Sequence, residues 1–183
     1  MPPRPRAPAI PNAVLATVFF IFTEMMLFSG FISAHTISRS LYPVWPPPNQ
    51  PRLPIEATAF NTAVLIASAV LMYFAGRRHG EGKSAGLFTG GMVLGLWFVV
   101  AQGYEWVGLL RDGLSISTST YASFFYLIVG THAVHVTAGL LVMAWLRWRQ
   151  TQGTLTAEAF QAGRVYWYFV VGLWPILYWR VYL

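Results

Sequence analysis

Acidic and histidine side chains inside long apolar segments are the residues of this sequence best suited to chemistry. Glu24 lies near the middle of an apolar run that extends from Ala13 to Ser38. An ionised carboxyl at that depth in a bilayer costs about 3 kcal/mol or more to insert, so we expect Glu24 to be neutral or hydrogen-bonded to a neighbouring helix. Two roles remain open for it: an interhelical hydrogen-bond donor, or a group that handles protons or contacts a partner.

Another apolar run carries His132 and His135, whose spacing of three places both imidazoles on one face of a helix. Two imidazoles at this spacing can supply two metal ligands. Further ligands for a four-coordinate site would have to come from other segments of the chain: His35, His79, Glu24 and Glu105. We therefore predict no metal site, and we interpret the two histidines as a buried, hydrogen-bonded pair that joins helices or meets the polar face of a partner.

Gln102 and Glu105 are also three residues apart, near the end of a third apolar run. Their spacing places both side chains on one helix face. A carboxyl at the depth of the membrane interface is less costly than one at the centre of the bilayer. We therefore expect Glu105 to belong to a satisfied polar network at the outer end of its helix.

Long helices have to position these side chains, and the composition indicates that the helices are embedded in a membrane. Of the 183 residues, 56% are hydrophobic and only 10% are charged, whereas about 25% are charged in soluble domains. A bilayer core of about 30 Å requires roughly 20 apolar residues of helix. The sequence therefore predicts an all-α bundle of five transmembrane helices within one membrane domain, residues 1–183, with approximate spans 13–38, 58–76, 85–110, 118–146 and 159–182.

The basic residues predict the orientation of the bundle. If each segment crosses once, eight of them fall on the side of the N-terminus and of the second and fourth loops: Arg4, Arg6, Arg77, Arg78, Lys83, Arg147, Arg149 and Arg164. Four fall on the opposite side: Arg39, Arg52, Arg111 and Arg180. Because cytoplasmic loops carry an excess of Lys and Arg, the N-terminus is predicted inside and the C-terminus outside. The formal net charge of +6 thus reflects topology, and we expect no nucleic-acid partner.

Several classes of site are excluded by residues that the sequence lacks. With no cysteine, the chain cannot form disulfides, thiolate zinc sites, cysteine-ligated iron–sulfur clusters or covalent haem links through a C-x-x-C-H motif. It contains no nucleophile-elbow or H-E-x-x-H motif, so it is not a stand-alone hydrolase. We expect the chain to bind no cofactor of its own and to have no catalytic residue.

Two further patterns concern packing. Residues 42–51 are rich in proline and predict an ordered or semi-rigid interfacial loop, because proline cannot continue a helix. Gly86, Gly90, Gly91 and Gly95 form a stripe of small residues in the third apolar run. Such a stripe predicts the close approach of a neighbouring helix.

Taken in chain order, these features resemble subunit III of the cytochrome c oxidases of the haem–copper family. The resemblance extends over nearly the whole chain from about Val18. It rests on six segments: Phe22-Thr23-Glu24 with Phe28 to Phe31, the Trp45-Pro46-Pro47 loop, Asn61 to Leu65 with Ser68, Gln102 with Glu105, Phe124-Phe125 to Val136, and Tyr166 to Tyr178.

The closing helix departs from the family pattern. Where the family has Trp-His-Phe-Val-Asp, this sequence has Tyr168 in place of the His and Val171 in place of the Asp. If the family His is the partner of the acid in the first helix, Tyr168 is expected to take its place as a hydrogen-bonding phenol to Glu24. The full-length family members have seven helices and this chain resembles their last five, which agrees with the predicted orientation.

The resemblance implies a multi-pass protein of the bacterial inner (cytoplasmic) membrane. It would be the non-catalytic subunit III of a proton-translocating cytochrome c oxidase in aerobic respiration, packed against subunits I and II, which would hold the haem and copper. It would bind phospholipid between helices and support proton uptake and stability. Two alternatives remain open: an accessory subunit of a nitric oxide reductase, and a small proton-coupled transporter with Glu24 as carrier, although the paired repeats and interrupted helices typical of transporters are not evident.

Overall fold

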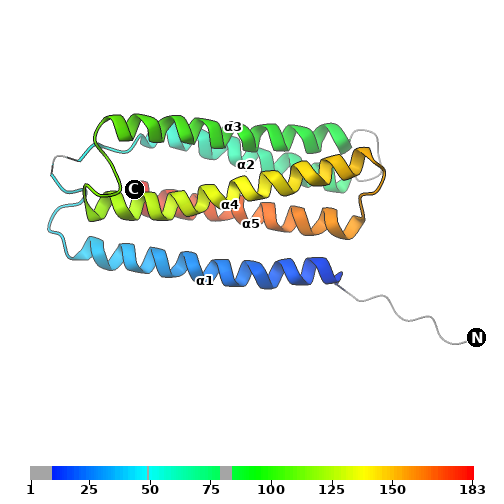
Figure 1. Cartoon of the computed structure of the whole chain (residues 1–183), viewed down its shortest axis with the longest axis horizontal. Helices are drawn as coiled ribbons and strands as arrows, with labels where there is room; N and C mark the ends of the chain where they lie inside the picture. The colour runs from blue at the N-terminus through cyan, green and yellow to red at the C-terminus, as the bar shows by residue number, and fades with distance from the viewer. Residues whose placement is uncertain (1–9, 49, 79–83) are drawn as a thin grey trace, which may run out of the picture.

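Five long helices make up the protein in the computed structural model, which describes residues 10–48, 50–78 and 84–183 (Figure 1). No strand occurs among these described residues, and the predicted all-α class is confirmed. Four residues used in the sequence analysis lie outside the described residues: Arg4, Arg6, His79 and Lys83. The helices are α1 (Asn12–Ser40), α2 (Ile55–Arg77), α3 (Ser84–Arg111), α4 (Thr120–Thr151) and α5 (Ala157–Tyr182).

Local capping explains where α3, α4 and α5 begin or end. The side chains of Ser119 and Thr156 accept hydrogen bonds from backbone N–H groups in the first turns of α4 and α5, which satisfies donors that a helix start leaves free. Gly113 and Gly153 follow α3 and α4 with φ of +90° and +66°, a left-handed conformation that suits glycine. Because Ser119 is the cap, α4 begins at Thr120, two residues later than the expected start at 118. The helix extends beyond its apolar run and ends at Thr151.

Four of the five described helices, α1 to α4, are long and apolar enough to cross a membrane. The fifth, α5, has Arg164 in its first third and Arg180 near its end, and is not among them. Successive helices run in opposite directions, so the beginning of α1, the end of α4 and the beginning of α5 lie at one end of the bundle (Figure 1). The C-terminus lies at the other end.

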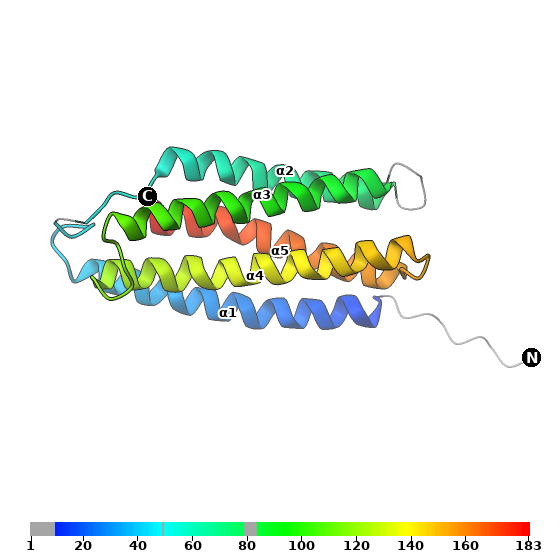
Figure 2. The ribbon, with the colours of Figure 1, turned by 45° about the horizontal axis from the view of Figure 1, so that its top comes forward.

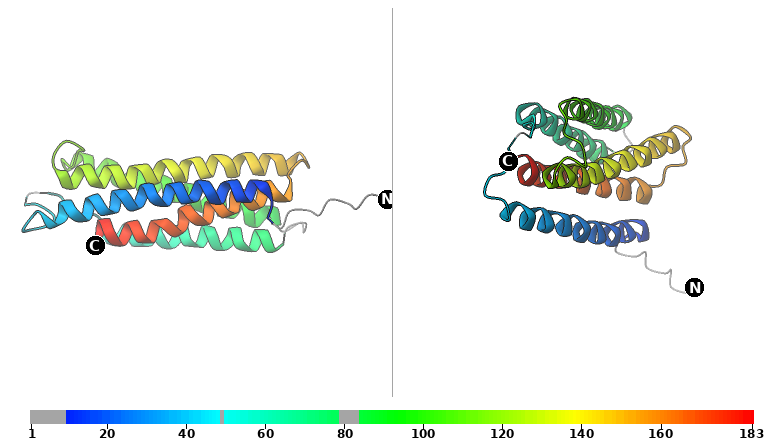
Figure 3. Two further views of the ribbon diagram at one scale, coloured as in Figure 1. Left: turned by 90° about the horizontal axis from the view of Figure 1, so that it is seen from below. Right: turned by 60° about the vertical axis from the view of Figure 1, so that its left-hand side comes forward.

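The helices form three layers, which Figures 1 and 2 show from two directions. The α4–α5 pair lies in the middle, with α2 and α3 on one side and α1 alone on the other (Figure 3). Of the described helices, α1 contacts only α4 and α5. Its outward face is formed by exposed apolar side chains, among them Phe19, Phe22 and Met26, a composition that suits contact with lipid or with another hydrophobic protein surface.

Two tryptophans of α5 fill the centre of the bundle. Trp167 and Trp174 are fully buried, and their indole nitrogens donate to hydroxyls of α2. Trp167 Nε1 lies 3.1 Å from Ser68 Oγ, and Trp174 Nε1 lies 2.9 Å from Thr62 Oγ1. Pairing both indoles removes the cost of burying an N–H group away from water. These bonds tie the middle layer to α2.

The glycine stripe of α3 makes close approach possible at two of its four positions. A methyl group on Gly91 would lie 3.0 Å from the backbone oxygen of Ser68, and one on Gly95 would lie 2.7 Å from the Trp167 ring. At Gly90 the nearest neighbour would be a leucine side chain of α2 at 3.2 Å, and at Gly86 there is open space. The predicted close packing is therefore present, but it depends on Gly91 and Gly95 rather than on the whole stripe.

The proline-rich segment between α1 and α2 contacts the beginning of α4. The Trp45 ring packs edge-on against Tyr121 and His35, with centroid distances of 5.2 and 5.5 Å. The Tyr42 hydroxyl donates to Thr120 Oγ1 at 3.2 Å. These contacts hold His35, which is buried, in an aromatic setting near the end of α1, and they order the loop as the proline content predicted.

Candidate functional site

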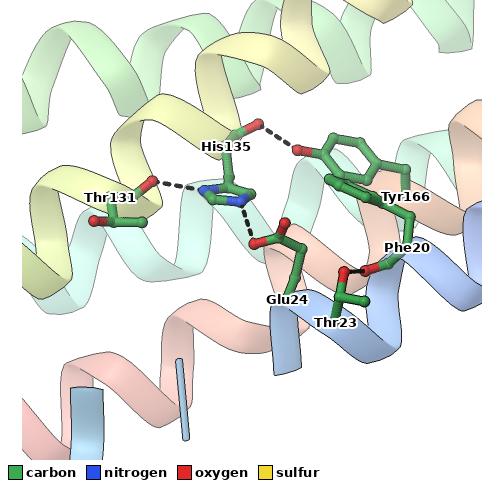
Figure 4. Close-up of polar contacts among 6 residues, drawn as sticks. All are labelled: Phe20, Thr23, Glu24, Thr131, His135 and Tyr166. Carbon is green, nitrogen blue, oxygen red and sulfur yellow. Dashed lines mark hydrogen bonds and ion pairs between the residues drawn. The ribbon is translucent and has the colours of Figure 1, made fainter. Parts of the chain in front are cut away.

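Glu24 of α1 and His135 of α4 meet in the interior of the apolar region (Figure 4). Glu24 Oε2 lies 2.7 Å from His135 Nε2, and both side chains are about nine-tenths covered, with exposed fractions of 14% and 13%. The other ring nitrogen, Nδ1, lies 2.8 Å from the carbonyl oxygen of Thr131. Both nitrogens of the imidazole are therefore occupied, and α1 is joined to α4 by a polar contact at mid-helix.

The partners of His135 fix the proton count of this pair. A carbonyl oxygen can only accept, so Nδ1 carries a proton and donates it to Thr131. One more proton must then lie between His135 Nε2 and Glu24 Oε2, either on the carboxyl or on the imidazole. In both arrangements the net charge of the pair is zero, which is what an apolar membrane interior tolerates at lowest cost.

The expected pairing of Tyr168 with Glu24 is wrong. The Tyr168 hydroxyl instead accepts hydrogen bonds from Arg164, whose Nη2 and Nε lie 2.9 and 3.3 Å away. The tyrosine of α5 that does reach the Glu24 site is Tyr166, whose hydroxyl donates to the backbone oxygen of His135 at 3.1 Å. The physical reason is helix geometry: two residues along α5 amount to a rotation of about 200°, which turns Tyr168 away from α1.

His132 does not share the contacts of His135. It is fully buried and its ring stacks on Trp174, at 4.9 Å between centroids and 25° between planes. Neither of its ring nitrogens has a hydrogen-bond partner among the residues that the structure describes. The prediction of a hydrogen-bonded histidine pair is thus wrong for His132, and across residues 10–48, 50–78 and 84–183 no group of three or more His, Asp and Glu side chains is arranged to hold a metal ion.

Glu105 lies in a second polar cluster, nearer the C-terminal end of α3. Its Oε2 lies 2.7 Å from Gln102 Nε2 and 2.9 Å from Thr58 Oγ1, and its Oε1 accepts from Asn61 Nδ2 at 2.9 Å. Gln102 Nε2 also donates to the Tyr182 hydroxyl at 3.2 Å. The cluster joins α2, α3 and α5, and every oxygen of the carboxyl has a donor. Both Gln102 and Asn61, which the sequence analysis selected, lie in it.

The whole length of the bundle is similar to known proteins. A model of the cytochrome c oxidase subunit III family matches residues 11–183. "Cytochrome c oxidase subunit 3" of Synechocystis sp. is 32% identical over 177 residues, which cover 93% of this chain and 75% of that protein. The chain belongs to the cytochrome c oxidase subunit III family. "Probable cytochrome c oxidase subunit 3" of Mycobacterium leprae is 33% identical, with 94% and 88% covered, and the Mus musculus subunit is 34% identical, with 90% and 67% covered.

Within this subunit III chain, several side chains of the two clusters were missed by sequence reasoning. Thr58 bonds to Glu105 and Tyr182 bonds to Gln102, although they lie 47 and 77 positions from Glu105 in the chain. Tyr166 appeared only as part of the family resemblance, and nothing in its local sequence indicated that its hydroxyl reaches α4. A hydroxyl inside an apolar run is itself a signal, since such a group needs a partner in a membrane, but the pattern does not say which partner.

Proposed function

We propose that this chain is the non-catalytic subunit III of a proton-translocating cytochrome c oxidase in aerobic respiration. Its membership of the subunit III family, on a match over residues 11–183, is the observation that carries the proposal. In this proposal subunits I and II are its partners, the haem and copper lie in those subunits, and this chain takes no direct part in electron transfer. The relatives named cytochrome c oxidase subunit 3 in bacteria support the same assignment.

The Glu24–His135 pair is the part of the chain best suited to support proton uptake and stability in the complex. A proton shared between Oε2 and Nε2 at 2.7 Å can sit on either group without creating net charge. The pair also fastens α1, which contacts no other described helices than α4 and α5. We propose that it stabilises the α1 face of the bundle during turnover and keeps a protonatable group within the membrane.

A phospholipid is the ligand that we propose for the groove beside this pair. The groove has a volume of about 570 Å³ and lies among α1, α4 and α5, with largely apolar walls that include Ala16, Phe20, Trp145 and Tyr166. It lies toward the end of the bundle where α1 begins and α4 ends. An acyl chain lying in such a groove buries its CH₂ groups against protein at no cost in polar contacts.

The membrane placement follows from the same assignment. We propose five spans in a single membrane domain of the bacterial inner (cytoplasmic) membrane, with the N-terminus inside and the C-terminus outside. The eight-to-four distribution of basic residues supports this orientation. Since the chain contains no cysteine, single substitutions Gln152→Cys and Ser117→Cys, on opposite ends of the bundle, test it. A membrane-impermeant maleimide added to intact spheroplasts should label the second and not the first.

The assembly itself is tested by purifying the tagged chain in mild detergent and measuring haem and copper in what comes with it. We expect a haem–copper catalytic subunit to be retained. Recovery of the chain with haem and non-haem iron but no copper would favour a nitric oxide reductase, and recovery without any haem protein would overturn the proposal.

The role of the pair is tested by Glu24→Gln in the same complex. Because a Gln amide can still donate to His135 Nε2, we expect assembly and initial turnover to be retained while the lifetime of the enzyme during turnover shortens. A matched control is Thr23→Val, which removes only a hydrogen bond from Thr23 to Phe20 within α1. Loss of haem from the complex in Glu24→Gln, or an unchanged lifetime, would contradict the proposed role.

A further inference from the structure

A cavity of about 120 Å³ lies between α3, α4 and α5. Phe98 and Val99 of α3 and Val129 of α4 form apolar parts of its wall, and Trp174 closes it on the α5 side. Phe98, Val129 and Trp174 are themselves buried, so the cavity reaches into the core of the bundle. It shares no lining residue with the groove that we propose for a phospholipid.

The wall of this cavity does not suit water. Three lining side chains carry polar groups, but Gln102 Oε1, Trp106 Nε1 and both ring nitrogens of His132 are covered by neighbouring protein atoms. The surface that the cavity presents to an occupant is therefore almost wholly apolar. A water molecule inside a protein needs two to four polar partners. Because the wall does not supply them, water would lose hydrogen bonds by entering.

The size of the cavity suits a small apolar molecule. A protein cavity of about 150 Å³ lined by Leu, Ile and Phe stays dry and binds benzene or xenon, and the cavity here, at about 120 Å³, is slightly smaller. Atoms that line a void lack attractive dispersion contacts on one side. An apolar molecule that fits restores those contacts, and it needs no hydrogen bond in return.

The bilayer gives such a molecule access at the contact between α3 and α4. Gly103 of α3 lines the cavity and is exposed, and a methyl group built on it would meet no neighbouring atom. Trp106 and Ala133 line both this cavity and a shallow outer groove between the same two helices. A molecule dissolved among the acyl chains can therefore reach the cavity without crossing a polar layer.

A gas fits this cavity better than the end of a lipid chain does. The groove among α1, α4 and α5 has a volume of about 570 Å³, compared with about 120 Å³ here. An acyl chain that enters a small cavity loses rotational freedom about its bonds, which costs free energy, whereas a monatomic or diatomic gas has no such freedom to lose. We propose that this cavity is a binding site for a small apolar gas that enters from the bilayer between α3 and α4. The test of this site does not depend on the proposed function.

The test uses the full-length chain in lipid bilayers with ¹³C-labelled valine methyl groups, whose chemical shifts are followed by NMR as the pressure of xenon is raised. Xenon bound in the cavity should shift the methyl signals of Val99 and Val129 along a curve that saturates. Val100, the next residue on α3, is 63% exposed and reports xenon dissolved among the acyl chains. We expect the shift of Val100 to rise linearly with pressure.

Val129→Phe fills the cavity from a side chain that is itself buried, and we expect it to abolish the saturating shift at Val99. The matched control is Val134→Phe on the same helix, which should keep that shift because Val134 is 67% exposed and points away from the cavity. A linear shift at both Val99 and Val129 in the wild-type chain would overturn the proposal. Magnetisation transfer from water or acyl-chain protons to the Val129 methyl groups would also overturn it, because it would show a different occupant. These wild-type measurements decide the matter even if Val129→Phe fails to fold.

Discussion

The Glu24–His135 contact predicts a measurable coupling energy between α1 and α4. The perturbation is a double-mutant cycle built from Glu24→Leu, His135→Leu and the two together. Each single substitution leaves one polar group of a 2.7 Å contact without a partner inside the bundle. The double substitution leaves neither, because it removes the carboxyl and the whole imidazole. Nδ1 and its bond to Thr131 are lost with the ring.

The magnitude follows from the cost of the unpaired group. Leaving one buried polar group unsatisfied costs about 1–3 kcal/mol, so each single variant should lose about 2 kcal/mol of stability. The double variant leaves neither group unpaired, so it should lose no more than about 2 kcal/mol rather than the sum, which gives a coupling of at least about 2 kcal/mol. Hydrogen bonds in membrane proteins average only about 0.6 kcal/mol with a maximum near 1.7. This pair is predicted at or above the top of that range, because its carboxylate–imidazolium arrangement is a charge-assisted hydrogen bond.

Unfolding by sodium dodecyl sulfate in lipid bicelles, followed by tryptophan fluorescence, measures the four free energies of the cycle. Thr23→Val combined with His135→Leu is the control pair, since the Thr23 hydroxyl bonds only within α1, and its coupling should be near zero. A coupling below about 0.5 kcal/mol for Glu24 and His135, within the scatter of additive sites, would refute the reasoning.

Three other substitutions have expected costs in the same unfolding assay. Gly91→Leu should destabilise the protein by about 1–3 kcal/mol because its side chain would meet a backbone carbonyl of α2, whereas Gly86→Leu, which faces open space, should be near neutral. Trp167→Phe should lower the free energy of unfolding by about 1–3 kcal/mol, because it removes a hydrogen bond and leaves a buried void. Its control, Trp179→Phe at an exposed position, should lower it by less than about 0.5 kcal/mol. Glu105→Leu removes three hydrogen bonds. Thr58 and Gln102 keep a second acceptor, so the unpaired group is the Asn61 amide and the cost should be about 1–3 kcal/mol. A cost no larger than that of Trp179→Phe would contradict the described cluster.

Periodic and local features of the fold were open to prediction from the sequence. The apolar runs indicated helices where α1 to α5 lie, since the thickness of a bilayer sets the length of an apolar segment. The spacing of Gln102 and Glu105 was enough to place both side chains on one face, and the structure shows their contact at 2.7 Å. Helix ends were less accessible, because a cap such as Ser119 depends on a single hydrogen bond rather than on a pattern.

Pairings between helices were not open to prediction in this way. His132 and His135 are the same residue type, and their spacing places both on one helix face. His135 nevertheless bonds to Glu24, whereas His132 lines a cavity. The choice between Tyr166 and Tyr168 was likewise decided by how α5 is rotated against α1 and α4. Both outcomes depend on the relative rotation and offset of helices, which a sequence pattern leaves free.

The sequence alone determined that this protein is a helical membrane bundle with acids and histidines inside its apolar segments, because hydrophobicity and helical period are properties of each segment by itself. Its ordered motifs also indicated the subunit III family. Only the tertiary structure decided which polar groups satisfy one another and which remain unpaired. Because helix rotation and offset set these contacts, His135 is paired with Glu24 while His132, one turn away, has no hydrogen-bond partner among the described residues.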